Sequence, residues 1–255
     1  LSMLWALTRR LETLGLHPVV YDWGYSKNTG ALTRRAVDEG SLGGMIFGMP
    51  KFLSTLGGKK RRGNLPVVTL EFSVPSAHSV THDNFGGGFL AGESLRGQAD
   101  QYLVLASKRE EIPSHQRAEG FLKAFSEDAR ELKKVRVLNV VRGNQLQEGY
   151  DYGLRNRPRR GTRTGVFSLW GDYFGAGLLR AWTEQGLGVG QDFLLIGYDN
   201  LDMSPTLKPA MTSIRQPVRK MGEAAADLMA EVMKDPGMEP KRLVFPAELV
   251  KGETD

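Results

Sequence analysis

The chain has 255 residues, of which 40% are hydrophobic and 25% charged, and its formal net charge at pH 7 is +5. These values are typical of a soluble globular protein that holds one large α/β domain or two small ones, and they do not indicate disorder. Cysteine is absent, which excludes disulfides, thiol catalysis and cysteine-ligated zinc. No apolar run approaches the length of a membrane span, and no signal-peptide pattern opens the sequence.

Strands and helices are predicted to alternate along residues 1–70. Leucines at helical spacing stop at Gly15, and short apolar segments separated by turn residues follow them. This alternation is typical of a parallel sheet covered by helices on both faces. Such a domain ordinarily opens on a central strand, and none precedes the first helix, so we expect the chain to begin inside its own domain. The predicted elements are a helix at 3–14, a strand at 18–21, a helix at 29–39, a strand at 44–47, a short segment at 52–56 and a strand at 66–70.

The same plan is repeated after residue 82. Its clearest element is the uninterrupted apolar run at 193–196, because a run this short indicates a strand buried on both faces of a parallel sheet. Two series of similar size predict two lobes, each with its own sheet. The predicted elements are a helix ending at 95, strands at 102–105, 135–141, 166–169, 193–196 and 211–214, and helices at 116–128, 149–154, 173–185 and 218–234.

One segment carries a specific signature. Residues 197–200 are Gly-Tyr-Asp-Asn, residues 209–217 are Pro-Ala-Met-Thr-Ser-Ile-Arg-Gln-Pro, and residues 221–225 are Met-Gly-Glu-Ala-Ala. This series resembles the C-terminal signature of the lactose-repressor (LacI/GalR) family of transcriptional regulators. In that family a strand ends in Gly-aromatic-Asp-Asp/Asn, and Pro-x-Leu-Thr-Thr-Ile-x-Gln-Pro and Met/Leu-Gly-x-x-Ala follow. The resemblance covers most of the chain and is strongest from residue 82 to residue 250.

The resemblance implies an α/β fold of the periplasmic-binding-protein type I kind, with two parallel-sheet βαβ lobes and a ligand cleft between them. We expect the N-terminal lobe to comprise residues 1–106 and 218–244, with its first strand and the DNA-binding head missing from the chain. The C-terminal lobe is expected to comprise residues 107–217 and 245–255.

Arg117 and Asp199 are the main candidate ligand-binding residues. Asp199 ends a predicted strand, where ligands of open α/β sheets bind, although an acid at such a place also commonly caps a turn. Arg117 lies in Ser-His-Gln-Arg-Ala-Glu-Gly-Phe at 114–121, which resembles the family's Ser-x-x-Arg-x-x-Gly-Phe. In the family this arginine faces the effector, and a solvated helix residue is the alternative. A guanidinium and a carboxylate on opposite sides of a cleft can grip vicinal hydroxyl groups.

Four further residues complete the candidate site. Glu71 follows the predicted strand at 66–70, where relatives commonly place an acid, and a solvated loop acid is the alternative. Asp172 keeps the family's acid before a helix, whose simplest role is to cap the helix N-terminus. Trp170 and Trp23 can offer an aromatic face to a ligand, although each is more often part of a core or its rim.

The resemblance implies the effector-binding and dimerising core of a cytoplasmic transcriptional regulator that senses a small molecule, expected to be a sugar. Operator DNA would be bound through a helix-turn-helix head absent from these residues, and a homodimer would pass the ligand signal to paired heads. A periplasmic-type sugar-binding protein of a transporter is the alternative function. The four histidines lack metal-ligand spacing and no nucleophile motif is present, so no enzyme, metal or cofactor is predicted.

Overall fold

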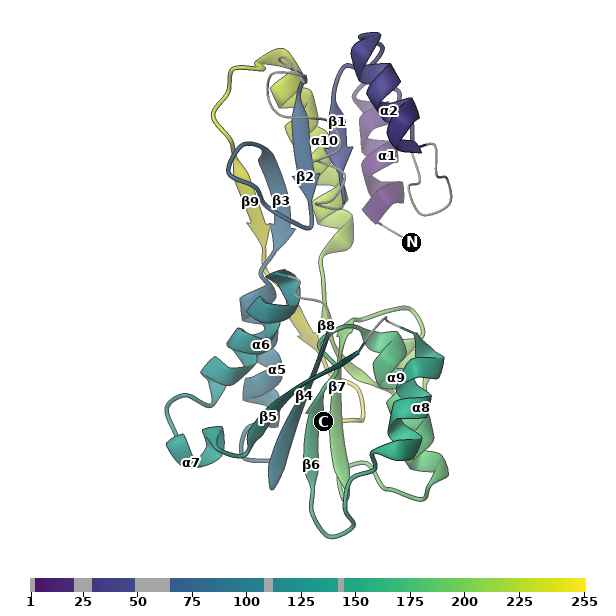
Figure 1. The fold of residues 1–255 in the computed structure, drawn as a ribbon, viewed down its shortest axis with the longest axis vertical. Coiled ribbons are helices and arrows are strands. Elements are labelled where there is room, and N and C mark those ends of the chain that lie inside the picture. Colours follow the sequence, from purple (N-terminus) through teal and green to yellow (C-terminus); the bar gives the residue numbers. More distant parts are fainter. Residues whose placement is uncertain (1–2, 21–28, 49–64, 108–111, 142–144) are drawn as a thin grey trace. The chain divides into compact units, whose positions relative to one another are not determined.

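The computed structural model describes residues 3–20, 29–48, 65–107, 112–141 and 145–255, and the chain divides into two compact units (Figure 1). Unit 1 comprises Leu1–His82 and Pro217–Phe245, and unit 2 comprises Asp83–Gln216 and Pro246–Asp255. The chain therefore crosses between the units three times, after His82, after Gln216 and after Phe245.

Unit 1 is built on a parallel sheet with the strand order β1-β2-β3-β9. The amphipathic helix α10 packs on three of these strands, and α1 packs on α10. Leu7 and Leu11 of α1 meet Met221 and Leu228 of α10 in the core of the unit. The elements are α1 (Met3–Thr13), α2 (Thr29–Asp38), β1 (Met45–Phe47), β2 (Val67–Leu70), β3 (His78–His82), α10 (Val218–Lys234) and β9 (Arg242–Phe245).

Unit 2 contains a six-stranded sheet with the order β10-β8-β7-β6-β4-β5, in which only β10 is antiparallel to its neighbour. The pair α5 and α6 covers one face and the pair α8 and α9 covers the other (Figure 1). The elements are α5 (Asn84–Leu95), β4 (Gln101–Ser107), α6 (Ile112–Ala124), α7 (Ala129–Leu132), β5 (Val135–Val141), α8 (Leu146–Arg155), β6 (Thr164–Phe167), α9 (Asp172–Glu184), β7 (Phe193–Asp199), η1 (Ser204–Thr206), β8 (Thr212–Arg215) and β10 (Glu248–Val250).

Strand β7 is buried on both faces, as its apolar run predicted. Leu194 and Ile196 belong to the core under α5 and α6, whereas Phe193 and Leu195 belong to the core under α8 and α9. Successive side chains of a strand point to opposite faces, so one strand serves both cores. The predicted α/β class, with a parallel sheet in each of two units, is confirmed.

The helices of each pair in unit 2 approach closely through glycines. A Cβ on Gly88 of α5 would overlap the carbonyl of Arg117 in α6, and a Cβ on Gly120 of α6 would overlap the carbonyl of Phe85 in α5. The glycines therefore let the two backbones touch, and this contact fixes where α6 places the side chain of Arg117.

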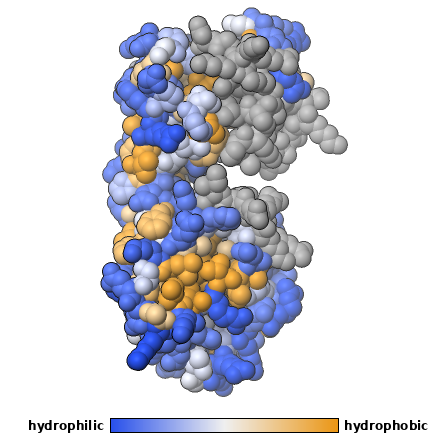
Figure 2. Space-filling model, turned by 60° about the vertical axis from the view of Figure 1, so that its left-hand side comes forward, coloured by the Kyte–Doolittle hydropathy of each residue, from blue (hydrophilic) through white to orange (hydrophobic). Residues whose placement is uncertain are grey.

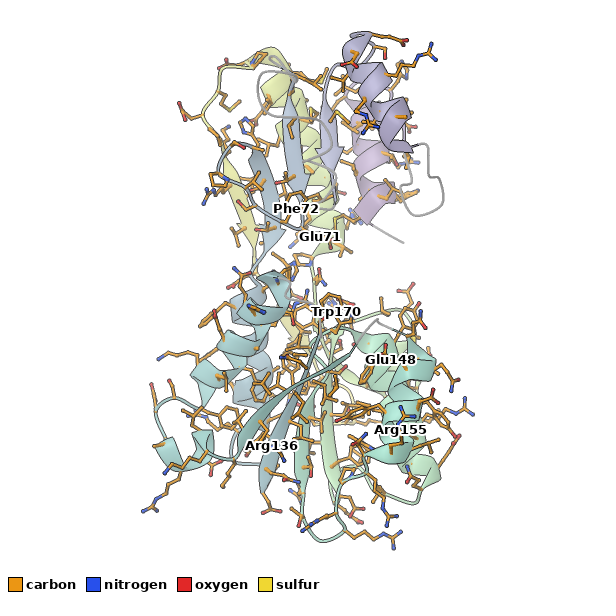
Figure 3. All side chains as sticks on the ribbon, in the orientation of Figure 1. Glu71, Phe72, Arg136, Glu148, Arg155 and Trp170 are labelled. Carbon is orange, nitrogen blue, oxygen red and sulfur yellow. The ribbon has the colours of Figure 1, made fainter. Side chains whose placement is uncertain are left out.

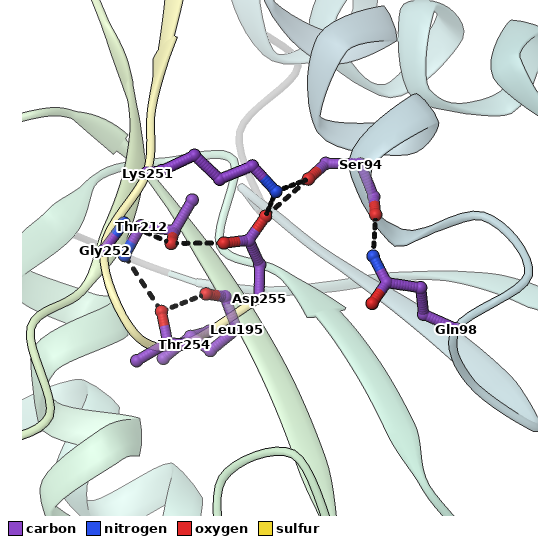
Figure 4. Close-up of polar contacts among 8 residues, drawn as sticks. All are labelled: Ser94, Gln98, Leu195, Thr212, Lys251, Gly252, Thr254 and Asp255. Carbon is purple, nitrogen blue, oxygen red and sulfur yellow. Dashed lines mark hydrogen bonds and ion pairs between the residues drawn. The ribbon is translucent and has the colours of Figure 1, made fainter.

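Residues 251–255 are anchored inside unit 2 by Asp255 (Figure 4). Its Oδ1 accepts from Thr212 Oγ1 at 2.6 Å, and its Oδ2 accepts from Ser94 Oγ at 2.5 Å and from Lys251 Nζ at 2.6 Å. Burial would raise the pKa of the Asp255 carboxyl, but these hydrogen bonds outweigh burial and hold the pKa below its usual value. The tail thus ties β8 to α5.

Several sequence expectations are wrong. The expected strand at 18–21 is absent from the described residues 18–20, where Val19 and Val20 are 66% and 56% exposed. Valine favours a strand only where neighbours cover its side chain, and these two valines have no such cover. The helix expected at 116–128 begins at Ile112 and ends at Ala124. Elements β3, α7, β9 and β10 were not expected, and the segment expected at 52–56 lies outside the described residues.

The expected lobe boundary at residue 106 is also wrong. Residues 83–106 contain α5 and all of β4 except Ser107, and both elements belong to unit 2. The physical reason is strand pairing: β4 lies between β5 and β6 in the six-stranded sheet, and α5 packs against α6. The sequence predicted these elements but did not specify which sheet they join.

Candidate functional site

Polar residues gather where the parallel strands of unit 2 end. In open α/β sheets, ligands bind outside the carboxyl ends of the strands. At this edge β7 ends in Asp199, β8 is followed by Gln216, and β6 is followed by residues 168–172. Helix α6 adds Arg117. The described structure thus brings Arg117, Asp199 and Asp172 of the predicted site into one unit.

Arg117 is a buried residue with internal partners. Its side chain is 7% exposed, its Nε donates to Asn84 Oδ1 at 2.7 Å, and its Nη1 donates to the carbonyl of Leu169 at 2.8 Å. The guanidinium lies over the ring of Tyr198, 3.6 Å from the ring centroid. The alternative that Arg117 is a solvated helix residue is therefore wrong. Its position is fixed by an amide, a backbone carbonyl and an aromatic face.

Tyr198 connects Arg117 with the end of β7. Its ring is fully buried and packs against Phe167, with 6.2 Å between the ring centroids. Burial raises the pKa of the Tyr198 hydroxyl to about 12, although the charge of Arg117 opposes the shift. Tyr198 therefore stays neutral and serves as the platform on which the guanidinium rests.

Asp199 has an unusual backbone conformation and a fixed side chain. Its φ is +100° and that of Asn200 is +48°, a region that residues other than glycine rarely adopt. Asp199 Oδ1 accepts from Gln216 Nε2 at 2.5 Å. Strained backbone of this kind clusters at functional sites, which supports the choice of Asp199 as a site residue.

Gln216 is a candidate that the sequence reasoning missed. Its side chain is 9% exposed, and its Oε1 has no hydrogen-bond partner among the described residues. Because Nε2 is bound to Asp199, the amide cannot turn without losing that bond, and Oε1 stays an acceptor. A buried acceptor without a donor is costly, so a ligand that supplies the donor would bind favourably. The signal was present in the Ile-Arg-Gln-Pro signature at 214–217, but the signature does not reveal an unpaired oxygen.

Asp172 does not cap its helix. The N-cap of α9 is Gly171, and the Asp172 carboxylate instead accepts from the Leu201 amide at 2.9 Å, Ser204 Oγ at 2.5 Å and Ser213 Oγ at 2.6 Å. The side chain is fully buried, and burial raises its pKa to about 6, although these hydrogen bonds oppose the shift. Capping is thus a wrong expectation, because the residue turns inward to donors from β8 and the segment after β7.

Trp170 and Glu71 lie in different units. Trp170 is partly buried at the end of β6 and packs against both hydrophobic cores of unit 2 (Figure 3). Glu71 directly follows β2 in unit 1, is exposed and has a φ of +71°. Its amide donates to the carbonyl of Val80 at 2.9 Å, which extends the contact between β2 and β3. Trp23 lies outside the described residues.

No group of three or more His, Asp or Glu side chains among the described residues is arranged to hold a metal ion. In the same part of the chain, no helix is both long and apolar enough to cross a membrane.

The sequence matches a known domain family. The pattern of the periplasmic binding protein-like domain matches residues 99–254, more than half of the chain. Over 175 residues the chain is 31% identical to the HTH-type transcriptional repressor PurR of Mannheimia succiniciproducens, a match that covers 66% of this chain and 50% of that protein. The chain thus spans about half the length of the curated relatives it matches.

Solved structures share the fold. A LacI family transcriptional regulator from Enterococcus faecalis V583 with bound ribose is similar with a TM-score of 0.80 and 23% identity, over 99% of this chain and 92% of that chain. The lac repressor dimer bound to operator and the anti-inducer ONPF is similar with a TM-score of 0.77 and 21% identity, over 99% of this chain and 87% of that chain. The domain match places the chain in the periplasmic binding protein-like domain family, and the repressor relative supports its resemblance to the lactose-repressor (LacI/GalR) family.

Proposed function

We propose that this chain is the effector-binding and dimerising core of a DNA-binding transcriptional regulator that senses a small molecule, and that the molecule is a sugar. The observation that carries the proposal is the pairing of Asp199 with Gln216 at the carboxyl end of the unit 2 sheet. One partner is an acid on strained backbone, and the other holds an unpaired acceptor oxygen. Both features favour a ligand that donates hydrogen bonds.

The chemistry of these side chains suits a sugar. Asp199 and Gln216 present acceptors, whereas Arg117 presents a donor group. A sugar hydroxyl can donate and accept at once, so neighbouring hydroxyls can satisfy acceptor and donor side chains together. Trp170 adds an aromatic surface in the same unit, which suits the apolar face of a sugar ring. We therefore assign ligand contact to Arg117, Asp199, Gln216 and Trp170. Glu71 and Trp23 stay proposals from the sequence.

Regulation of DNA binding is the second part of the proposal. The relative with 31% identity is named a helix-turn-helix transcriptional repressor, which favours a cytoplasmic regulator over a transporter's solute-binding protein and over an enzyme. We assign operator binding to a helix-turn-helix head that is not among these 255 residues. The chain crosses between its units three times. We expect a ligand that binds one arrangement of the units more tightly to raise the population of that arrangement.

A second copy of the chain is the proposed partner. Leu4 and Trp5 of α1 are 47% and 48% exposed, and in unit 2 Phe85 and Val137 are 42% and 39% exposed. Hydrophobic residues also gather on one face of unit 2 (Figure 2). Large exposed apolar areas commonly mark protein interfaces, and paired DNA-binding heads require a dimer. Sedimentation velocity at micromolar concentration should therefore give about twice the chain mass of 28.2 kDa.

Titration calorimetry against two ligand classes tests the effector assignment. The sugar class contains D-ribose and cellobiose, and the purine class contains hypoxanthine and adenine. We expect a sugar to bind and both purines to give no heat beyond dilution. Asp199→Asn should weaken the sugar, and Asp151→Asn on the surface of α8 is the matched control. Binding of a purine without binding of any sugar would overturn the sugar assignment.

A further inference from the structure

The turn at Asp199 has a backbone conformation that surrounding contacts must stabilise. Asp199 and Asn200 are consecutive residues with positive φ, at +100° and +48°. A positive φ is unfavourable for a residue other than glycine and persists only where surrounding contacts impose it. The contacts that impose this conformation should therefore lie directly around the turn.

Those contacts converge on the carboxylate of Asp172. Its Oδ2 accepts from the Leu201 amide, the first residue after the strained pair, and from the hydroxyl of Ser204. Its Oδ1 accepts from the hydroxyl of Ser213 in β8. The Ser213 oxygen in turn accepts from the amide of Asn200 at 3.0 Å. The turn is thus bound to Asp172 once directly and once through Ser213.

Gly197 shows how closely the carboxylate lies against β7. A Cβ at this position would overlap Asp172 Oδ1, so a side chain here would displace the acid. The carboxylate reaches the strand two residues before Asp199 and the turn two residues after it. The donors of Leu201 and Ser213 face different oxygens of the side chain at position 172. A carboxylate accepts at both oxygens and presents no donor of its own, so it satisfies both.

We propose that Asp172 is a positioning residue of the effector site, whose carboxylate holds the turn of Asp199 and Asn200 so that Asp199 meets the ligand. The role of Asp199 in this inference rests on the proposed function. Asp172 is fully buried and lies on α9, whereas Asp199 ends β7, so the acid acts through the turn and does not touch the ligand itself. Ser213 provides the second of the two links between Asp172 and the turn.

Hydrogen exchange on the ligand-free chain tests the positioning directly. Asp172→Asn replaces one acceptor oxygen with a donor group, and Ser213→Ala removes the link to Asn200. In both variants the amides of Asn200 and Leu201 should exchange at least about tenfold faster than in the wild type, while the amides of β2 and β3 keep their protection. Asp151→Asn is the control: its carboxylate, on half-buried Asp151 of α8, accepts from exposed Gln147, and the variant should leave all these amides unchanged. The amide proton resonance of Leu201 should also move in Asp172→Asn, because its acceptor changes.

Two outcomes would overturn the inference. One is unchanged exchange at Asn200 and Leu201 in Asp172→Asn, and the other is a uniform rise in exchange across unit 2, which indicates general loosening. With a sugar that binds the wild type, the dissociation constant should rise about tenfold in Ser213→Ala, because this variant loses the hydrogen bond that Ser213 accepts from the amide of Asn200. Failure of every sugar to bind would contradict the proposed function but would not alter the exchange result, so the two ideas fail separately.

Discussion

Gln216 donates its side-chain amide to Asp199 at 2.5 Å, and Gln216 is the last residue of unit 2 before the chain crosses to unit 1. Arg117 has an equivalent partner, because its Nε donates to Asn84, the second residue after the chain enters unit 2. Each of the two main candidate ligand residues is therefore bound to a residue beside a crossing. We therefore expect a ligand that contacts Arg117 or Asp199 to affect the conformation of the segments that join the units.

Gln216→Leu should weaken the ligand without harming the fold. Gln216 Oε1 is a buried acceptor without a partner among the described residues, so removal of the amide relieves one cost while it breaks the bond to Asp199. We expect the free energy of unfolding to change by no more than about 1 kcal/mol and the affinity for the sugar to fall about tenfold. Calorimetry and urea unfolding measure the two quantities, and exposed Gln147→Leu is the control. Wild-type affinity in Gln216→Leu would remove Gln216 from the site.

Arg117→Ala should cost stability as well as affinity. The side chain is buried and makes two hydrogen bonds and a cation–π contact, so its loss leaves Asn84 and the Leu169 carbonyl without their donor. We expect the free energy of unfolding to fall by about 3 kcal/mol. Arg180→Ala removes an exposed pair with Glu184 and should cost less than about 0.5 kcal/mol. Urea denaturation compares the two variants, and equal effects would contradict the internal role of Arg117.

Asp172 should make stability depend on pH between about 4 and 6. Its folded pKa is raised to about 6 from 3.8, so the folded state holds a proton in this window that the unfolded state has released. Its contribution to stability therefore falls as pH rises from about 4 to 6, by about 3 kcal/mol, and is constant above that range. Urea unfolding of wild type and Asp172→Asn across pH 4–7 isolates the effect, because other carboxylates cancel in the difference. A difference that does not vary with pH would contradict the raised pKa.

Gly88→Ala should destabilise the chain, although alanine is the better helix former. In an unobstructed helix this change would add about 1 kcal/mol of stability. Here the added Cβ would overlap the backbone carbonyl of Arg117, which α6 can avoid only by moving away. We expect a loss of about 1–3 kcal/mol. Gly237→Ala, where a Cβ would lie 3.6 Å from Asp235 Oδ1, is the control and should be nearly neutral in thermal unfolding.

The elements that the sequence predicted well have one strong local pattern. The helix at 218–234 and the strand at 135–141 have the predicted bounds, because an apolar stripe marks the helix and a valine-rich segment marks the strand. Strands β9 and β10 were not predicted because they are only four and three residues long and Pro246 follows β9 directly. Their strand conformation depends on pairing with β3 and β8, which are distant in sequence.

The site residues that belong to a sequence motif were predicted. Those whose role depends on contacts between distant parts of the chain were not. Arg117 and Asp199 were predicted from the family signature, and the structure places both at the carboxyl ends of the parallel strands of unit 2. The role of Asp172 could not be predicted, because its partners Ser204 and Ser213 are 32 and 41 residues away in the chain. Gln216 lies within the signature, but a sequence motif cannot show that its Oε1 has no donor among the described residues.

The interleaving of the two units also sets the order in which the chain can fold during synthesis. Unit 2 is nearly continuous, from Asp83 to Gln216, whereas unit 1 joins its first 82 residues to Pro217–Phe245. Leu7, Val68 and Val80 share their core with Met221 and Leu228 of α10, so they stay without cover until α10 leaves the ribosome. The segment of unit 1 that precedes unit 2 in the chain therefore completes its core after unit 2, and until then chaperones can bind its uncovered valines and leucines. Mutations in α10 should lower the yield of folded chain more than equally destabilising mutations in α9.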